Sequence, residues 1–389
     1  MTFPKVNVLP VGDGACTVLR PWPEREPGPS VVIDCGVRRA KSEDAAQMLL
    51  DSLGGTLSMV EAFVISHFDW DHWGGLKYLS KLSKVPQDLS SSTLYYPRMP
   101  KLIPTGLLAM LGGLGGTGSA ALDLHHSLKN LLRTGETLSL CPLTAESKPI
   151  ELAGEKFEVI WPPREIGKSF SRRLHGAVEA VEDLAARLKE DGYPELQRNL
   201  DFGSLATEFL ADLEINDDVD ADSSQPAPKN NELESSFEDE RGDDDYESAG
   251  ERWSEQDDEL TPPALLSLPL AWHDEYKKVL KRIRRANNDL SLVLASETGG
   301  IVCFGDIGGP ALREALISLK DRHFGVMLAP HHGTHPFPPG MPSSRWCIAQ
   351  GGPDHGPQWK KIHSAQPHKS HRCWNTHYEL EFTKRRPAL

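Results

Sequence analysis

The segment at residues 66–75 reads Ser-His-Phe-Asp-Trp-Asp-His-Trp-Gly-Gly and holds four side chains that can bind metal within six positions. They are His67, Asp69, Asp71 and His72. An apolar run at 60–65 precedes them and predicts a buried strand. Because Asp71 and His72 are adjacent, they must point in different directions, which favours two metal ions over one. A polar surface turn is the alternative, but it leaves the apolar strand before the segment and the Gly-Gly after it unexplained.

Two later segments add ligand candidates, each at the end of a predicted strand. Asp306 follows the strand-like residues 300–304, although an aspartate among glycines is by itself more often a turn residue. His331 and His332 follow the buried run 326–329. Either of the two could bind metal; we include His331 in the ligand set, with His332 as a supporting group or proton donor.

Together these candidates form a set of six ligands: His67, Asp69, Asp71, His72, Asp306 and His331. Three of the six are carboxylates, and carboxylate-rich sites favour harder ions such as Mn²⁺, with Zn²⁺ still open. We therefore predict a site for two divalent metal ions. Such a pair supports hydrolysis, because it makes water more acidic and neutralises developing negative charge.

The signature His-x-[His/Asp]-x-Asp-His-x-Gly-Gly of metallo-β-lactamase-fold hydrolases resembles residues 67–75. The aspartate in its third position resembles the ComEC-type competence branch rather than the lactamases or glyoxalases. Further segments resemble that branch in the same order: 11–14, 32–36, 157–163, 288–294, 305–307 and 329–334. The resemblance covers less than half of the chain.

This resemblance implies an αββα sandwich and a nuclease or phosphodiesterase-like activity. It also implies metal ligands at His67, Asp71, His72, Asp306 and His331, with Asp69 in the place of a histidine. ComEC proteins have a membrane channel that this sequence lacks, so DNA import is not implied. The lactamase-like branches have a further ligand histidine before the position of Asp306, and the histidines available here stand in no recognisable context: His125, His126, His175 and His273.

The organisation of the chain points to an α/β fold, with two packed mixed sheets covered by helices. Residues 1–163 and 287–389 are predicted to form one domain of this kind. Residues 164–286 are predicted to be a large insertion. Within it we expect a disordered acidic loop at about 214–260 and a basic helix at about 274–285.

The acidic loop accounts for the net charge of −14, since it holds 19 acidic and three basic residues. The remainder of the chain is close to neutral, so the charge does not exclude an anionic substrate. The loop is a candidate surface for protein partners. A second hypothesis is that it folds back onto the basic helix, in the place of a nucleic acid.

Several residues are predicted to act on the substrate. Asp71 would position the nucleophile as well as bind metal, and His332 would supply a proton. Candidates for substrate contacts are Asn288, Ser291, Lys281, Arg285 and His363. For the two cations a solvated helix face is the alternative, and for His363 an ordinary surface or packed histidine.

The preferred function is a metal-dependent hydrolase of phosphodiester bonds in DNA or RNA. A small phosphodiester, a cyclic nucleotide, a lactone or a thioester would use the same site. A non-enzymatic alternative is a regulatory or partner-binding subunit of a multi-protein system, for example in defence, whose acidic loop is the functional part.

The cellular compartment is predicted from what the sequence lacks. Six scattered cysteines form no C-x-x-C pair, which is typical of reduced thiols in the cytoplasm. The first residues form no basic and apolar leader. No apolar stretch reaches the roughly 18 residues that cross a bilayer. We therefore expect a soluble, cytoplasmic protein without a membrane partner.

Overall fold

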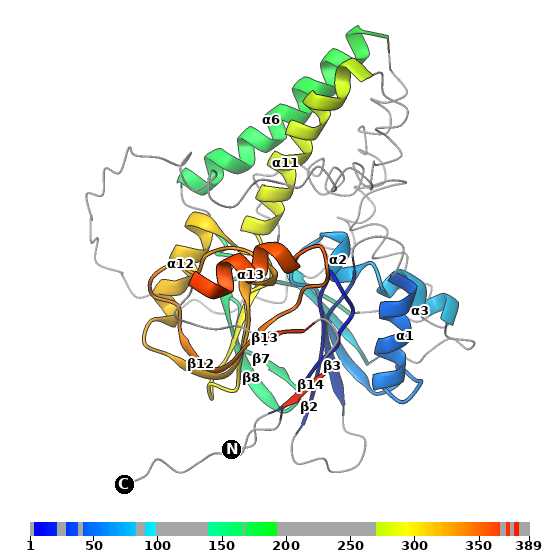
Figure 1. Ribbon diagram of the computed structural model, residues 1–389, viewed down its shortest axis with the longest axis vertical. Helices are drawn as coiled ribbons and strands as arrows, with labels where there is room; N and C mark the ends of the chain where they lie inside the picture. The colour runs from blue at the N-terminus through cyan, green and yellow to red at the C-terminus, as the bar shows by residue number, and fades with distance from the viewer. Residues whose placement is uncertain are drawn as a thin grey trace, which may run out of the picture.

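The computed structural model describes residues 4–21, 29–37, 42–82, 89, 91–98, 139–165, 168–192, 270–365, 371–373 and 377–380. Within these ranges the strands form two seven-stranded sheets. The two sheets pack against each other, and helices lie on the outer side of each (Figure 1). This arrangement is the αββα sandwich of the metallo-β-lactamase fold and confirms the predicted fold class.

The first sheet has the strand order β14-β1-β2-β3-β4-β5-β6. Its strands are β1 (Lys5–Val8), β2 (Cys16–Arg20), β3 (Ser30–Cys35), β4 (Val60–Val64), β5 (Thr93–Pro97), β6 (Ser139–Leu143) and β14 (Tyr378–Leu380). Strands β14 to β3 pair antiparallel, and β3 to β6 pair parallel. Because β3 and β4 are parallel, Asp34 near the end of one and His67 after the other lie at the same edge of the sheet.

The second sheet has the order β13-β12-β11-β10-β9-β8-β7. Its strands are β7 (Ile150–Leu152), β8 (Glu155–Trp161), β9 (Val293–Ser296), β10 (Ile301–Cys303), β11 (His323–Leu328), β12 (Ser343–Ala349) and β13 (His371–Arg372). Strands β10 to β13 pair parallel, and β7 to β10 pair antiparallel. The parallel pair β10 and β11 therefore brings the loops with Asp306 and His332 to one edge.

Side-chain alternation along the strands divides the core into layers. Val31 and Ile33 of β3 lie in the core between the sheets, whereas Val32 between them packs under the helices of the first sheet. In the second sheet Leu294 faces the central core and Val293 the outer one. Both faces of each sheet are buried, which explains the near-continuous apolar runs of these strands.

The helices cover the two outer faces. On the first sheet lie α1 (Ser42–Ser52) and α3 (Leu76–Leu82), with the single turn α2 (Trp70–Trp73), which contains the predicted ligands Asp71 and His72. On the second side lie α6 (Lys168–Glu190), α11 (His273–Asp289), α12 (Gly309–Leu319) and α13 (Gly356–Ala365), with the 3-10 turns η4 (Leu270–Trp272) and η5 (Pro330–Gly333). Helices α6 and α11 pair lengthwise and project from the sandwich as an arm (Figure 1).

The basic helix predicted at 274–285 is confirmed as α11, which continues to Asp289. The acidic segment 214–260 lies outside the described residues. The ends of the predicted insertion that are described, α6 and most of α11, share one hydrophobic core with α12 and the second sheet. The division into a domain and an insertion stays a prediction.

Two further expectations concern cysteines and membranes. All six cysteines lie in the described part of the chain, and none of them forms a disulfide bond there. Among the described helices, none is both long enough and apolar enough to cross a membrane.

Candidate metal centre

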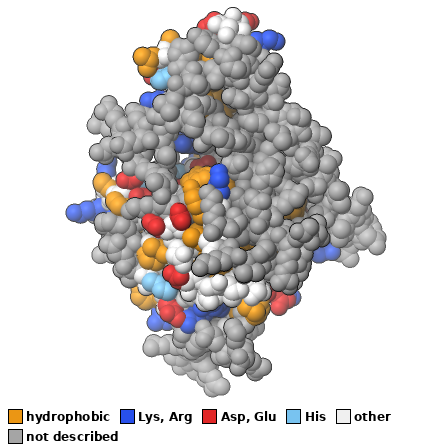
Figure 2. All heavy atoms as spheres, turned by 90° about the vertical axis from the view of Figure 1, so that its right-hand side faces the viewer, with side chains coloured by type: hydrophobic (Ala, Val, Ile, Leu, Met, Phe, Trp, Pro, Cys, Tyr) orange, Lys and Arg blue, Asp and Glu red, His pale blue; other side chains and the backbone are white. Residues whose placement is uncertain are grey.

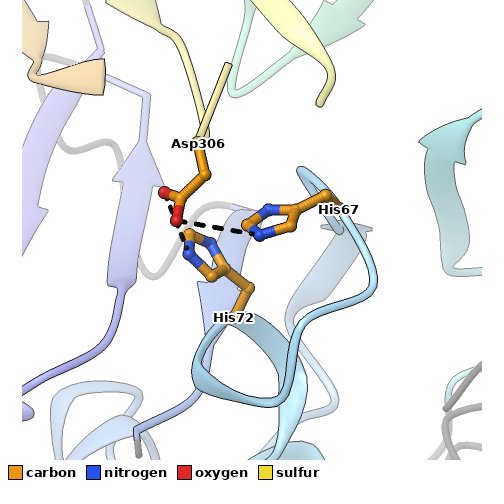
Figure 3. A group of neighbouring side chains, drawn as sticks. All are labelled: His67, His72 and Asp306. Carbon is orange, nitrogen blue, oxygen red and sulfur yellow. Dashed lines mark ion pairs between the residues drawn. The ribbon is translucent and has the colours of Figure 1, made fainter. Parts of the chain in front are cut away.

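Four side chains on three segments from both sheets converge at the edge of the sandwich. His67 and His72 come from the turn after β4, Asp306 from the turn after β10, and His332 from η5 after β11. Figure 3 shows the rings of His67 and His72 directed at the carboxylate of Asp306 from the opposite sheet. All four side chains are buried.

Asp306 lies at the centre of this cluster. Its Oδ1 is 3.3 Å from His72 Nε2, and its Oδ2 is 3.4 Å from His332 Nε2 and 3.9 Å from His67 Nε2. One carboxylate therefore faces three imidazole nitrogens. This position suits a carboxylate that bridges two cations.

Asp69 and Asp71 lie on opposite sides of the cluster. Asp69 Oδ2 is 3.7 Å from His67 Nε2, whereas Asp71 Oδ2 is 3.5 Å from His332 Nε2. The groups that could hold an ion are His67 with His72 and Asp306, and Asp71 with His72 and His332. Adjacent residues Asp71 and His72 both contribute to the second group, and Asp69 extends the first.

The three histidines direct the same ring nitrogen into the cluster. His72 Nδ1 donates to Asp34 Oδ2 at 2.9 Å, and His332 Nδ1 donates to the backbone carbonyl of Gln350. The hydroxyl of Ser66 donates to Asp34 at 2.8 Å and can accept from His67 Nδ1 at 3.1 Å. With Nδ1 protonated and bonded, each Nε2 presents a lone pair, as metal-binding histidines do.

The residues present fit a divalent ion. His67 Nε2 is buried and has no hydrogen-bond partner among the described residues. His72 Nε2 and His332 Nε2 lie 3.2 Å apart, so two acceptor lone pairs would face each other without a cation or proton between them. Metal bonds of about 2.1 Å at tetrahedral angles separate ligand atoms by about 3.4 Å, close to the distances in the cluster.

In the absence of metal, protons take the place of the cations. Burial by itself lowers the pKa of His332, but Asp306 and Asp71 outweigh it and raise that pKa to about 9. Burial likewise lowers the pKa of His72, yet Asp306 and Asp34 raise it well above its usual value. Burial raises the pKa of Asp306, and the neighbouring histidines hold it well below its usual value. The site is therefore built for positive charge.

Because the pKa of His332 is raised, a proton must leave its ring before an ion binds. Metal affinity is therefore expected to increase as the pH rises from about 6.5, the ordinary pKa of histidine, to about 9. Each displaced proton contributes about tenfold per pH unit. The stabilisation that this protonated histidine gives the metal-free protein is complete below about pH 6.5 and is lost as the pH rises through about 9. Calorimetric titration in buffers of different ionisation enthalpy measures the protons released. Zero release at pH 7.5 would contradict this assignment.

The geometry reverses the expected roles of His331 and His332. His332 Nε2 lies among the ligand atoms, whereas His331 Nδ1 donates to the backbone oxygen of Asp306 at 3.2 Å. Both residues have positive φ, 49° and 54°, so the chain turns sharply here. The alternation of side-chain directions along β11 therefore cannot be extended to His331 and His332. His332 Nδ1 is bonded to the Gln350 carbonyl, so Nε2 is the ring nitrogen that faces the other candidate ligand atoms.

Two supporting aspartates were missed as site residues. Asp34 receives hydrogen bonds from the Ser66 amide and hydroxyl and from His72. Asp13 accepts from the amides of Gly352, Asp354 and His355. The ring of His355 stacks on His332 at 4.7 Å, so Asp13 fixes the loop behind that ligand. Both aspartates stand in the glycine-containing segments 11–14 and 32–36, whose family resemblance was a sequence signal for them.

Asn287, in the last turn of α11, was also missed, although its neighbour Asn288 was predicted. The buried Asn287 side chain donates to Asp69 Oδ1 at 2.7 Å and accepts from the Phe68 amide at 3.3 Å. It therefore holds the Asp69 side of the turn. Asn288 is half-buried, and its Oδ1 has no hydrogen-bond partner among the described residues.

The remaining predicted substrate contacts differ in outcome. Ser291 is fully buried, and its hydroxyl accepts a hydrogen bond from the Asp306 amide at 3.1 Å. It therefore positions Asp306 and cannot touch a substrate. Lys281 and Arg285 are exposed on α11. His363 belongs to α13, and its side chain lies outside the described part. His175 is exposed on α6 and bonded to Ser171, away from the cluster.

Two glycines allow the segments to approach closely. A Cβ at Gly36 would lie 2.4 Å from the backbone of Asp71, so only glycine permits β3 to end against the metal-binding turn. Gly305 has a φ of 56°, and a Cβ there would meet Ser66 and Ser291 at 3.0 to 3.1 Å. Glycine at both positions is therefore part of what brings the two halves of the centre together.

An αββα sandwich with a His/Asp cluster at the edge shared by its two sheets defines the class of metallo-β-lactamase-fold proteins. Residues 9–147 match the family model described as the Metallo-beta-lactamase superfamily. A comparison with curated proteins gave no match. Metal-dependent hydrolysis is the activity this superfamily suggests, and the match does not distinguish the ComEC-type branch. It includes residues 67–72 and ends before Asp306 and His332.

Proposed function

We propose that this protein is a metal-dependent hydrolase that cleaves phosphodiester bonds in DNA or RNA. The observation that supports it is the convergence of three imidazole Nε2 atoms and the carboxylates of Asp69, Asp71 and Asp306 at one edge of the sandwich. They come from sequence positions more than 200 residues apart. A structural ion-pair network would not need a buried, unbonded His67 Nε2.

In this proposal His67, Asp69 and Asp306 would hold one divalent ion, since both carboxylates lie within 3.9 Å of His67 Nε2. Asp71, His72 and His332 would hold a second, and Asp306 would serve both because it also lies within 3.4 Å of His72 Nε2 and His332 Nε2. Zn²⁺ and Mn²⁺ are the proposed ions, because the donor set combines imidazoles with carboxylates. Bound ions of this kind would acidify water and offset the charge that develops on a phosphodiester during hydrolysis.

The side chains of the centre have distinct tasks in this proposal. Asp34 and Ser66 hold His72 and His67 in the tautomer that presents Nε2. Asp71 orients the attacking water through its carboxylate. His331 lies at the edge of the cluster, with its Nδ1 on the Asp306 backbone, and is the group that would protonate the leaving oxygen.

The choice of a polymeric anion rests on α11. Its lysines and arginines are exposed, and its last turn touches the Asp69 side of the centre through Asn287. Burial alone raises the pKa of Asp69, but His67 and, more weakly, Arg284 lower it. The positive charge of α11 therefore reaches the Asp69 side of the metal centre.

The test combines metal analysis with a hydrolysis panel. Purified protein is expected to bind two Zn²⁺ or Mn²⁺ ions and to cleave bis-p-nitrophenyl phosphate and single-stranded DNA or RNA. Asp71→Ala and His67→Ala should each lower the rate by about 100-fold or more, because each removes a ligand. Protein that binds two ions but hydrolyses no phosphodiester, while cleaving a lactone or thioester, would overturn the substrate class.

A further inference from the structure

The exposed face of α11 carries six basic side chains in nine residues: Lys277, Lys278, Lys281, Arg282, Arg284 and Arg285. We call this set the basic ridge. The opposite face of α11 is apolar and buried against α6, through Tyr276, Val279 and Ile283. The basic residues therefore line the solvent side of a helix that is fixed along its length.

The acidic residues of α11 lie at its ends and two of them are paired with α6. Glu275 bonds to Arg187, and Asp289 bonds to Arg173 at 3.0 Å. Between residues 276 and 288 the helix has no acidic residue. At the free end of the arm acidic, basic and hydrophobic side chains are mixed (Figure 2).

The C-terminal end of the ridge is fixed to the candidate metal centre. Asn287 binds both Asp69 and the Phe68 amide, and Figure 1 shows α11 descending from the free end of the arm to the sandwich beside α2. Lys277, Lys281 and Arg284 recur at intervals of four and three residues, so they lie along one side of the helix.

We infer that the basic ridge of α11 binds the sugar–phosphate backbone of a nucleic acid on one side of the cleaved bond and leads it to the Asp69 side of the centre. That the bound strand is cleaved depends on the proposed function. The binding itself depends only on the basic ridge. From Lys277 to Asn287 the helix rises about 15 Å. Successive phosphates of one strand are about 3.4 Å apart along a duplex axis, so the ridge faces roughly four of them.

The experiment measures binding without hydrolysis. Full-length protein in EDTA is titrated against labelled single-stranded DNA, single-stranded RNA and duplex DNA, between about 50 and 200 mM salt. The test variant is Lys277→Glu/Lys281→Glu/Arg284→Glu. The control is Lys156→Glu/Lys320→Glu/Arg345→Glu, which changes the net charge equally with exposed residues at the far end of the second sheet.

Wild-type protein and the control are expected to bind with a steep salt dependence. The ridge variant should bind about 100-fold more weakly at low salt, and its log–log salt slope should fall by about 2, as for three lost phosphate contacts. Thermal unfolding of all three proteins confirms that they fold. Wild-type protein that fails to bind, or a ridge variant that binds like the control, would overturn the inference.

These outcomes are independent of the proposed function. If the ridge governs binding but no substrate is hydrolysed, the catalytic proposal fails and the binding surface stands. If oligonucleotides are cleaved while the ridge variant binds like the control, the inferred binding by the basic ridge is wrong and the proposed hydrolase activity is supported. The comparison of DNA, RNA and duplex identifies which polymer supplies the backbone.

Discussion

Asp306→Asn is expected to remove bound metal and to lower hydrolysis by about 1,000-fold or more, which corresponds to about 4 kcal/mol. Asp306 is the carboxylate within 3.9 Å of three Nε2 atoms, and the substitution keeps its shape while removing its charge. Both proposed ion sites lose affinity together, because Asp306 lies beside histidines of each of them. Elemental analysis of the purified protein and turnover with bis-p-nitrophenyl phosphate measure the effect.

Asp321→Asn is the matched control. Asp321 is exposed in the turn before β11, at the opposite end of that strand, and its φ of 61° is one that asparagine tolerates. Metal content and turnover of this variant should equal those of wild type. An Asp306→Asn protein that retains two ions with unchanged affinity would show that Asp306 does not bridge them.

The second large effect separates the two adjacent histidines. His332→Ala should lose one of the two ions and about 100-fold or more of the activity, since its Nε2 lies among the ligand atoms. His331→Ala should retain both ions and lose activity by roughly 100-fold, the range of a missing proton donor. Calorimetric metal titration and turnover, measured on both variants, distinguish the two roles.

Each variant is the control for the other, because the residues are neighbours in one turn. Unfolding in EDTA shows whether either alanine weakens the fold itself. A His331→Ala protein that loses an ion while His332→Ala retains both would restore the assignment made from the sequence alone.

The ligands near residue 67 were predictable because they are local. An apolar strand, alternating donors and a Gly-Gly exit place His67, Asp69, Asp71 and His72 in one turn, and the same turn is found in the structure. Asp306 was predictable for a related reason, since it ends a short buried strand. In both cases the candidate ligand lies at the end of a strand, and strands can be predicted from the apolar pattern of the sequence.

The supporting residues were not predictable, because their partners are distant in sequence. Asn287 meets Asp69 across 218 positions, and Asp13 meets the loop at Gly352 across 339. The helical spacing places Asn287, four residues after the buried Ile283, on the packed face of α11, but it does not predict which residue Asn287 meets there. The rotation of the helix against the sandwich buries Asn287 and leaves Asn288 half-buried.

The sequence by itself determined the αββα class, the metal-binding turn after β4 and the position of a basic helix, because each depends on side-chain periodicity over a few residues. Only the tertiary structure decided that His332 rather than His331 faces the centre, that Ser291 supports Asp306, and that α11 ends beside Asp69. The physical reason is that two consecutive positive φ angles and the packing of one sheet on another set these directions, and neither leaves a periodic trace in the sequence.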